Sequence, residues 1–362
     1  MRRTLLIALA VVAMACLPYP EPRPYDPGAD DAASLYAPYR RDGYFETPWR
    51  PFSKGALDLV RWMLTRNPYD KSAAPQVEVV ANSGADLAGR QNSARITWVG
   101  HATFAIHDGD DVVLTDPHFG HRALVPARYF PPGVPIEAVP DDALAVVSHN
   151  HYDHLDAYTV DTLAPSVRWF VPLGLADWFR ARGRDNVVEL GWWESARHGR
   201  WTMTCLPAQH WSRRIGQGTN ETLWCSWLLE SGDYRYYFAG DTGYFHGFAE
   251  FGRRFGPIDV AMLPIGAYEP RWFMREQHMD PAEAYRGFLA LGARLLLQMQ
   301  CGRFDLTPEP VDEAPKALRR AVEEAGATMD GIEVMAIGGS WHVPERATAS
   351  LGPTAQQPRT SP

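Results

Sequence analysis

A continuous apolar run that ends on a cluster of histidines and aspartates is the feature that most constrains this chain. The run "LAVVS" (Leu144–Ser148) has the length and composition of a β-strand buried on both faces. It continues as "HNHYDHLD", residues 149–156, which holds three histidines and two aspartates. Open α/β sheets bind ligands just beyond the carboxyl ends of their strands, so the sequence predicts a functional site here.

Short apolar runs of the same kind recur between residues 95 and 337 and alternate with helical patterns. Strands are expected at 95–99, 102–106, 112–116, 144–148, 169–172, 187–190, 202–206, 223–229, 234–239, 258–264, 294–299 and 332–337. Helices are expected at 157–163, 175–182, 248–255, 281–291 and 312–325. Buried strands alternating with helices predict a layered α/β fold.

The two ends of the chain differ in composition from residues 95–337. "MRR" followed by the apolar run Thr4–Ala15 is typical of an export signal, and "AMAC" places Cys16 as in a bacterial lipoprotein processing site. We therefore expect a signal peptide at 1–16, a Pro-rich tether at 17–43, one large folded domain at 44–346 and a disordered tail at 347–362. An ordinary secretory signal cleaved nearby is the alternative to lipidation.

Location and partners follow from the same features. The expected location is the cell envelope, with the chain held at the membrane through a lipid on Cys16; a cytoplasmic location is the alternative if the signal is not used. The net charge of -8 argues against a nucleic-acid partner. Beyond Cys16 only Cys205, Cys225 and Cys301 remain, an odd number that implies no disulfide framework.

The histidine cluster has the spacing of a metal site. His149 and His151 are two residues apart, so in extended backbone both imidazoles point to the same side. Asp153 and His154 follow where the chain turns toward a helix and can face a second point nearby. Imidazole and carboxylate groups bind zinc and similar divalent ions, and two such ions about 3.5–4 Å apart activate water near pH 7.

Two later strand ends supply further metal-capable groups. His210 follows the expected strand 202–206, and Asp241 follows the expected strand 234–239. Taken singly, each has a plainer explanation, a hydrogen-bonded histidine or a turn. Together with the first cluster they offer a third nitrogen for one metal and a carboxylate able to bridge two.

The order of motifs resembles the metallo-β-lactamase superfamily: "WVGHATFAI", "LTDP", "SHNHYDHLD", "PAQHWSRR" and "AGDTGYF". Within it, "LPIGAYEPRWFMREQHMDPAEA" (Leu263–Ala284) resembles the branch of N-acylphosphatidylethanolamine-hydrolysing phospholipase D. The resemblance runs from roughly Tyr44 to Trp341 and implies a four-layer αβ/βα sandwich. It implies one zinc on His149, His151 and His210 and a second on Asp153 and His154, with Asp241 bridging. Tyr152 and His278 match positions that contact the phospholipid.

One position departs from the family pattern. Relatives carry "MHWGTF" where this chain reads "MQCGRF", so Gln300 stands at the place of a seventh, histidine ligand. A glutamine carbonyl is a poorer zinc ligand than imidazole. Three outcomes are open: a weak second site, Cys301 as a substitute ligand, or a protein that works with one metal.

The sequence therefore predicts a zinc phosphodiesterase of phospholipase D type, with one or two zinc ions and with Asp153 and His278 as catalytic residues. His101 and Asp116 are expected to orient metal ligands rather than to bind metal. Hydrolysis of another bond (a lactone, an ester or a β-lactam) is an alternative because the superfamily hosts many reactions. A non-catalytic envelope lipoprotein with a degenerate metal site is the other.

Overall fold

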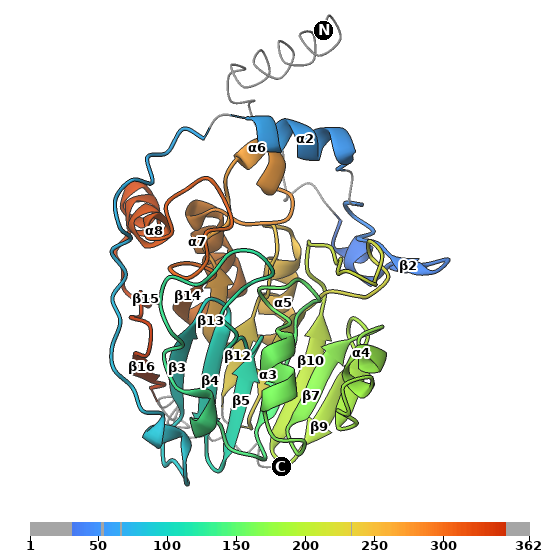
Figure 1. Cartoon of the computed structure of the whole chain (residues 1–362), viewed down its shortest axis with the longest axis vertical. Coiled ribbons are helices and arrows are strands. Elements are labelled where there is room, and N and C mark those ends of the chain that lie inside the picture. The colour runs from blue at the N-terminus through green and yellow to red at the C-terminus, as the bar shows by residue number, and fades with distance from the viewer. Residues whose placement is uncertain (1–30, 52–53, 66, 233, 345–362) are drawn as a thin grey trace, which may run out of the picture.

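The computed structural model describes residues 31–344 except 52, 53, 66 and 233 (Figure 1). The expected signal peptide with Cys16, the first part of the tether and the tail at 347–362 lie outside the described residues. Among the helices of the described ranges, none is long and apolar enough to cross a membrane.

Two seven-stranded sheets form the centre of the molecule. The first has the order β16-β3-β4-β5-β6-β7-β8 and the second β15-β14-β13-β12-β11-β10-β9. The first consists of β3 (Arg95–Gly100), β4 (Thr103–Asp108), β5 (Asp111–Thr115), β6 (Leu144–Val146), β7 (Arg168–Pro172), β8 (Val187–Leu190) and β16 (Ser340–His342). The second consists of β9 (Ser195–His198), β10 (Trp201–Leu206), β11 (Ser226–Glu230), β12 (Arg235–Phe238), β13 (Ile258–Pro264), β14 (Ala293–Met299) and β15 (Ile332–Glu333).

Each sheet joins an antiparallel half to a parallel half. In the first sheet β16, β3, β4 and β5 pair antiparallel, and β5 to β8 pair parallel. In the second sheet β9 to β12 pair antiparallel, and β12 to β15 pair parallel. Parallel strands need crossover connections. In every parallel pair except β5–β6, the connection contains a helix that the sequence predicts.

Helices cover the outer face of each sheet (Figure 1). Over the first sheet lie α3 (Ala157–Thr162) and α4 (Ala176–Arg180), and over the second lie α5 (Gly247–Phe255), α7 (Pro281–Leu291) and α8 (Glu313–Glu324). The short 3₁₀ helices are η2 (Ala32–Tyr36), η3 (Ala85–Leu87) and η4 (Ile136–Ala138). The four-layer αβ/βα sandwich expected from the sequence is confirmed.

The apolar run before the histidines is buried on both faces because its sheet lies between two cores. Leu144 and Val146 belong to a core shared with Phe238 of the second sheet. Ala145, between them, belongs to a separate core with Phe179 of α4. Alternate side chains thus enter different cores, and no polar position is left in the strand.

The expected tether at 17–43 is too long. Within it, the η2 residue Leu35 is 1% exposed, and Tyr36 stacks on Trp193 with ring centroids 4.5 Å apart. Trp193 Nε1–H donates to the Leu35 carbonyl at 2.8 Å. The hairpin of β1 (Arg40–Arg41) and β2 (Tyr44–Phe45) follows directly. The folded domain therefore includes residues from about 32, and the boundary at 44 is wrong.

Two expected strands are shorter than predicted because other groups take their backbone hydrogen bonds. In the expected strand 223–229, Leu223 N–H donates to the Leu173 carbonyl and Cys225 N–H to the Ser148 carbonyl, both in the first half of the chain. Only residues from Ser226 onward pair as β11. In the expected strand 332–337, Met335 N–H donates to the Gln298 side chain, so β15 stops at Glu333.

Candidate metal centre

Metal-capable side chains meet at one edge of the two sheets. They follow the ends of strands that are far apart in the sequence: Asp116 after β5, the 149–156 segment after β6, His210 after β10, Asp241 after β12 and Gln300 after β14. His101 lies in the turn between β3 and β4, and His278 lies between α6 (Arg271–Met274) and α7. The fold thus gathers every site residue that the sequence predicts within the described ranges.

The first group consists of His149, His151, His210 and Asp241, whose ligand atoms all lie within 4.8 Å of one another. His151 Nδ1 is 2.8 Å from His149 Nε2 and 3.2 Å from His210 Nε2. Asp241 Oδ2 is 3.8 Å from His210 Nε2 and 4.0 Å from His149 Nε2. Three imidazole nitrogens and one carboxylate oxygen therefore surround a common point.

Hydrogen bonds behind the rings orient two of these nitrogens. His210 Nδ1–H donates to the Gln277 carbonyl at 3.0 Å, which leaves the lone pair on Nε2, facing the group. Ser148 Oγ lies 2.8 Å from His149 Nδ1 in the same way. Ligand histidines in metal sites are typically held by such contacts on the other ring nitrogen.

The second group consists of Asp153 and His154 together with Asp241. His154 Nε2 is 3.3 Å from Asp153 Oδ2 and 3.1 Å from Asp241 Oδ1. Asp241 contacts the first group through Oδ2 and the second through Oδ1, which is the arrangement of a bridging carboxylate. His101 Nε2 lies 3.0 Å from Asp153 Oδ2 and Asp116 Oδ2 lies 2.6 Å from His154 Nδ1, so both contact ligand candidates.

The charges differ between the two groups. Burial lowers the pKa of His151 to about 4 and also holds the pKa of His149 and of His210 well below its usual value. Burial also acts against a charged His154, but the Asp241 and Asp153 carboxylates outweigh it and raise the pKa of His154. The first group thus presents neutral nitrogens, and the second an excess of negative charge.

These residues fit divalent metal ions. Neutral His151 has at most one proton on Nδ1, which lies between His149 Nε2 at 2.8 Å and His210 Nε2 at 3.2 Å, so at least one of these two lone pairs is left without a full hydrogen bond. In the second group, His154 Nε2 and Asp241 Oδ1 are both buried and 3.1 Å apart, yet neither makes a well-directed hydrogen bond in the described chain. Cations bound by nitrogen and oxygen ligands would satisfy the convergent lone pairs of both groups.

The backbone around the site is tightly specified. Gly240 has φ +57°, and a Cβ there would lie 2.6 Å from Ser148 Cβ. Only a glycine at this position therefore allows Asp241 to lie so close to the histidine segment. His101, Asp116 and Gln300 have φ of 57°, 33° and 59°, in the region that non-glycine residues avoid. Such conformations concentrate at functional sites.

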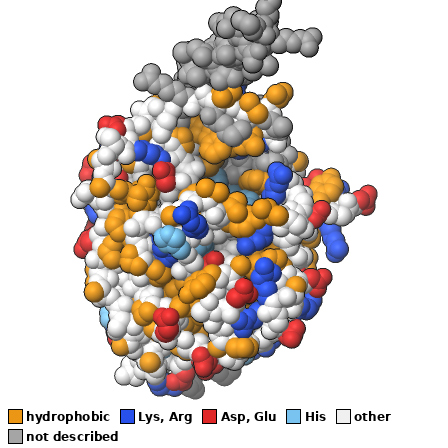
Figure 2. Space-filling view, in the orientation of Figure 1, with side chains coloured by type: hydrophobic (Ala, Val, Ile, Leu, Met, Phe, Trp, Pro, Cys, Tyr) orange, Lys and Arg blue, Asp and Glu red, His pale blue; other side chains and the backbone are white. Residues whose placement is uncertain are grey.

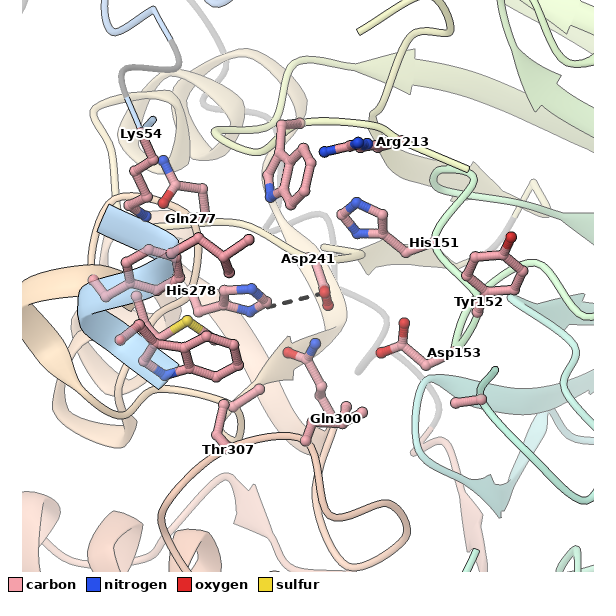
Figure 3. Close-up of a pocket in the computed structure, with 18 of the residues that line it drawn as sticks. Lys54, His151, Tyr152, Asp153, Arg213, Asp241, Gln277, His278, Gln300 and Thr307 are labelled. Atoms are coloured by element: carbon pink, nitrogen blue, oxygen red, sulfur yellow. Dashed lines mark ion pairs between the residues drawn. The ribbon is translucent and has the colours of Figure 1, made fainter. Parts of the chain in front are cut away.

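A large pocket opens onto both groups. It has a volume of about 940 Å³ and reaches His151, Asp153 and Asp241 (Figure 3). Its walls are mainly apolar, and they come from Leu59, Trp62, Leu124, Trp211, Phe273, Met274 and Leu306. Figure 2 shows its mouth as a hollow bordered by hydrophobic side chains.

Part of this wall was not predicted from the sequence. Helix α2 (Ala56–Leu64) and its neighbour α6 lie side by side above the sheets (Figure 1). Between them, the Trp62 and Phe273 rings stack with centroids 5.4 Å apart. Lys54 precedes α2, lines the pocket, and has its ammonium 4.7 Å from the Phe273 ring centroid. The apolar residues of α2 were the sequence feature that could have indicated this part of the wall.

His278 and Tyr152, the two residues expected to contact substrate, differ in which atoms they present to the pocket. His278 lines the pocket with Nδ1 3.8 Å from Asp241 Oδ2 (Figure 3). Tyr152 also lines it, but its hydroxyl accepts a hydrogen bond from Ile215 N–H at 3.1 Å and points away from Asp153. Tyr152 therefore offers its ring, not its hydroxyl, to the pocket.

At the end of β14, the side chain that faces the metal-capable groups is Gln300 and not Cys301. Gln300 lines the pocket, and Figure 3 shows its amide pointing toward Asp241 and Asp153. Cys301 belongs to none of the convergent groups among the described residues, and burial raises the pKa of its thiol to about 12. Because its sulfur is not among the atoms that converge there, ligation by Cys301 is not supported.

Comparison with known proteins identifies the family. The sequence profile described as "Beta-lactamase superfamily domain" matches residues 112–299. The chain belongs to the metallo-β-lactamase superfamily. It is 39% identical over 257 residues to N-acyl-phosphatidylethanolamine-hydrolyzing phospholipase D 1 of Caenorhabditis elegans, covering 66% of this chain and 72% of that protein. It is 36% identical over 322 residues to an uncharacterised Mycobacterium tuberculosis protein, covering 83% and 85%.

Solved structures share the fold at lower identity. The metallo hydrolase Igni18 of Ignicoccus hospitalis matches with a TM-score of 0.54 and 18% identity, covering 70% of this chain and all of that one. The diiron β-hydroxylase of Streptomyces venezuelae matches with a TM-score of 0.51 and 19% identity, covering 70% and 54%. These show that this superfamily member has the fold of metal-dependent enzymes.

Proposed function

We propose that this metal-dependent hydrolase is a zinc phosphodiesterase of phospholipase D type, acting on N-acylphosphatidylethanolamine-like phospholipids. The observation that carries the proposal is the 39% identity to a phospholipase D of that specificity. The pocket supports it, because about 940 Å³ with mainly apolar walls accommodates acyl chains next to the convergent ligands.

The first group would hold one metal through His149, His151, His210 and Asp241, and the second group another through Asp153, His154 and Asp241. Bound there, the metals supply Lewis acidity and lower the pKa of water toward neutrality. Asp116 and the Gln277 carbonyl keep His154 and His210 in the required orientation. This leaves the pocket residues to position the phosphodiester.

His278 and Lys54 are the polar groups suited to handle the phosphate and the leaving group. Burial lowers the pKa of His278, although the Asp241 carboxylate opposes it, so His278 is neutral at pH 7 and can hold or pass a proton. Burial lowers the pKa of Lys54 to about 8, partly offset by Glu276 and Asp58. Lys54 is thus largely cationic at neutral pH and attracts an anionic substrate.

The apolar wall receives the lipid portion. Trp62, Trp211 and Phe273 present aromatic surface to the pocket, and Leu59 and Met274 extend it. Acyl chains placed here leave the phosphodiester near Asp153 and His278. Water is excluded from one side of the scissile bond.

The test is turnover by purified protein on N-acylphosphatidylethanolamine and on bis-p-nitrophenyl phosphate, with and without a chelator. Release of N-acylethanolamine that is lost with the chelator and restored by zinc is expected. Chelator-insensitive turnover, or none on any phosphodiester, overturns the proposal. A lactone, an ester and a β-lactam assayed in parallel detect hydrolysis of another bond, and no turnover with metal bound indicates a degenerate site.

We also propose that the chain is exported and held at the membrane by a lipid on Cys16. The support is the basic start, the apolar run 4–15 and the small residues before Cys16. Metabolic labelling with a radioactive fatty acid tests this, with Cys16→Ala as control. Label that persists in Cys16→Ala, or a cytoplasmic unlabelled chain, contradicts it.

A further inference from the structure

Gln300 distinguishes the two metal positions by the chemistry of their ligands. The first position has three imidazole nitrogens and one oxygen of Asp241. The second has His154 Nε2 with oxygens of Asp153 and Asp241. His101 Nε2 also belongs to this group, but it lies within hydrogen-bonding distance of Asp153 Oδ2, at 3.0 Å. With Gln300 in place of a histidine, the next side chain facing the second position ends in an amide, whose oxygen is a possible ligand.

The Gln300 amide is available as a ligand. The residue is 3% exposed, and neither Oε1 nor Nε2 has a hydrogen-bond partner in the described part of the chain. Burying an amide without a partner is unfavourable, so a ligand or metal that accepts its lone pair is stabilising there. Figure 3 shows this amide pointing into the pocket toward Asp241 and Asp153.

The backbone fixes the side chain in that direction. Gln300 has φ 59°, and its N–H donates to the His101 carbonyl at 3.1 Å. Gly266 packs directly on its carbonyl, where a Cβ would come within 2.0 Å of the oxygen. Gln298, two residues earlier, is also a buried glutamine, but both atoms of its amide form hydrogen bonds with the Met335 backbone.

From these observations we propose that the two positions select different metals. The nitrogen-rich first position binds zinc. The second position, completed by Gln300 Oε1, binds Mn²⁺, and its preference for zinc over Mn²⁺ is much weaker than that of the first position. Carboxylate and carbonyl oxygens suit Mn²⁺ and other hard ions, whereas imidazole suits zinc. The proposal rests on the metal-dependent function above and concerns only which metal occupies each position.

The test measures metal binding without any substrate. Chelator-treated protein receives one equivalent of Zn²⁺, and the second position is then titrated with Zn²⁺ or Mn²⁺, Mn²⁺ being followed by electron paramagnetic resonance. The Zn²⁺/Mn²⁺ affinity ratio at the second position is expected to rise at least about tenfold in Gln300→His. Gln300→Leu is expected to weaken Mn²⁺ binding by about tenfold or more, and Gln300→Glu to retain it.

Gln76→Leu is the control. Gln76 is exposed, its side-chain amide donates to the Ala74 carbonyl at 3.3 Å, and it belongs neither to the pocket nor to the metal-capable groups of the described residues. Its replacement is expected to leave both affinities unchanged. An unchanged ratio in Gln300→His, or Mn²⁺ binding that survives Gln300→Leu, overturns the proposal. Failure of phosphodiester turnover bears on the proposed function and leaves this result standing.

Discussion

Asp116 Oδ2 lies 2.6 Å from His154 Nδ1, and both side chains are completely buried. Asp116 also accepts hydrogen bonds from the Ser148 amide at 2.6 Å and the Ser148 hydroxyl at 2.5 Å. The aspartate after β5 therefore ties the start of the histidine segment to the imidazole of the second group. This contact explains why Asp116 orients a ligand candidate without facing the pocket.

Asp116→Asn is expected to weaken the second metal position by about 10- to 100-fold, because an amide no longer supports His154 as a carboxylate does. The first metal should stay bound, since Asp116 contacts none of its ligand atoms except through Ser148. Metal content after dialysis against graded zinc measures both. Asp177→Asn, on the surface of α4, is the control. Equal loss of both metals would contradict this assignment.

His278→Ala is expected to lower kcat by about 10²-fold while leaving metal content unchanged. His278 Nδ1 lies 3.8 Å from Asp241 Oδ2 but belongs to neither convergent ligand group in the described chain. Loss of a group that positions or transfers a proton typically costs this much. Steady-state kinetics and metal analysis of the same preparation check it, with exposed His121→Ala as control. A variant that loses metal would show His278 to be a ligand.

The site was largely predictable because strand ends determine it. His149, His210 and Asp241 each follow an apolar run, and strands that run in the same direction end at the same edge of a sheet whatever their distance along the chain. The resemblance to the family added what spacing could not give, namely the position of a seventh ligand, where Gln300 stands. Neither source located Lys54, because its position depends on how α2 packs on α6.

The errors in the fold also have physical causes. Met335 was expected in a strand because its neighbours are apolar, yet the Gln298 amide replaces the strand ladder there. Leu35 was assigned to a tether because of its proline-rich surroundings, yet it enters the core through contacts with a distant segment around Trp193. Local pattern carries no information about such partners.

Gly240→Ala is expected to destabilise the protein by about 2–4 kcal/mol, through backbone strain and overlap with Ser148. The φ of +57° disfavours any side chain, and the new Cβ would lie 2.6 Å from Ser148 Cβ. Gly216→Ala is the matched control, because its φ is +85° but nothing lies within 4 Å. That control should cost about 1 kcal/mol. Thermal unfolding compares the two, and equal losses would mean that the contact with Ser148 does not matter.

The chelator-treated protein is expected to lose stability as pH falls from about 6.5 toward 4. Burial lowers the pKa of both His151 and His118 to about 4, so between these pH values the unfolded chain binds protons that the folded chain does not. A shift of this size corresponds to roughly 3 kcal/mol for each group. His154, whose pKa is raised, has the opposite sign, because its contribution is complete at low pH and is lost as pH rises through its folded value.

Urea unfolding at several pH values measures this slope, and His118→Asn isolates one contribution without touching the metal groups. His118 Nδ1 accepts a hydrogen bond from Arg128 at 3.1 Å, which an asparagine oxygen is able to replace. The variant should therefore fold at pH 7 and show a shallower loss of stability between pH 6.5 and 4. An unchanged slope would mean that His118 is solvated or protonated in the folded state, and its burial beside Arg128 would then not account for acid sensitivity.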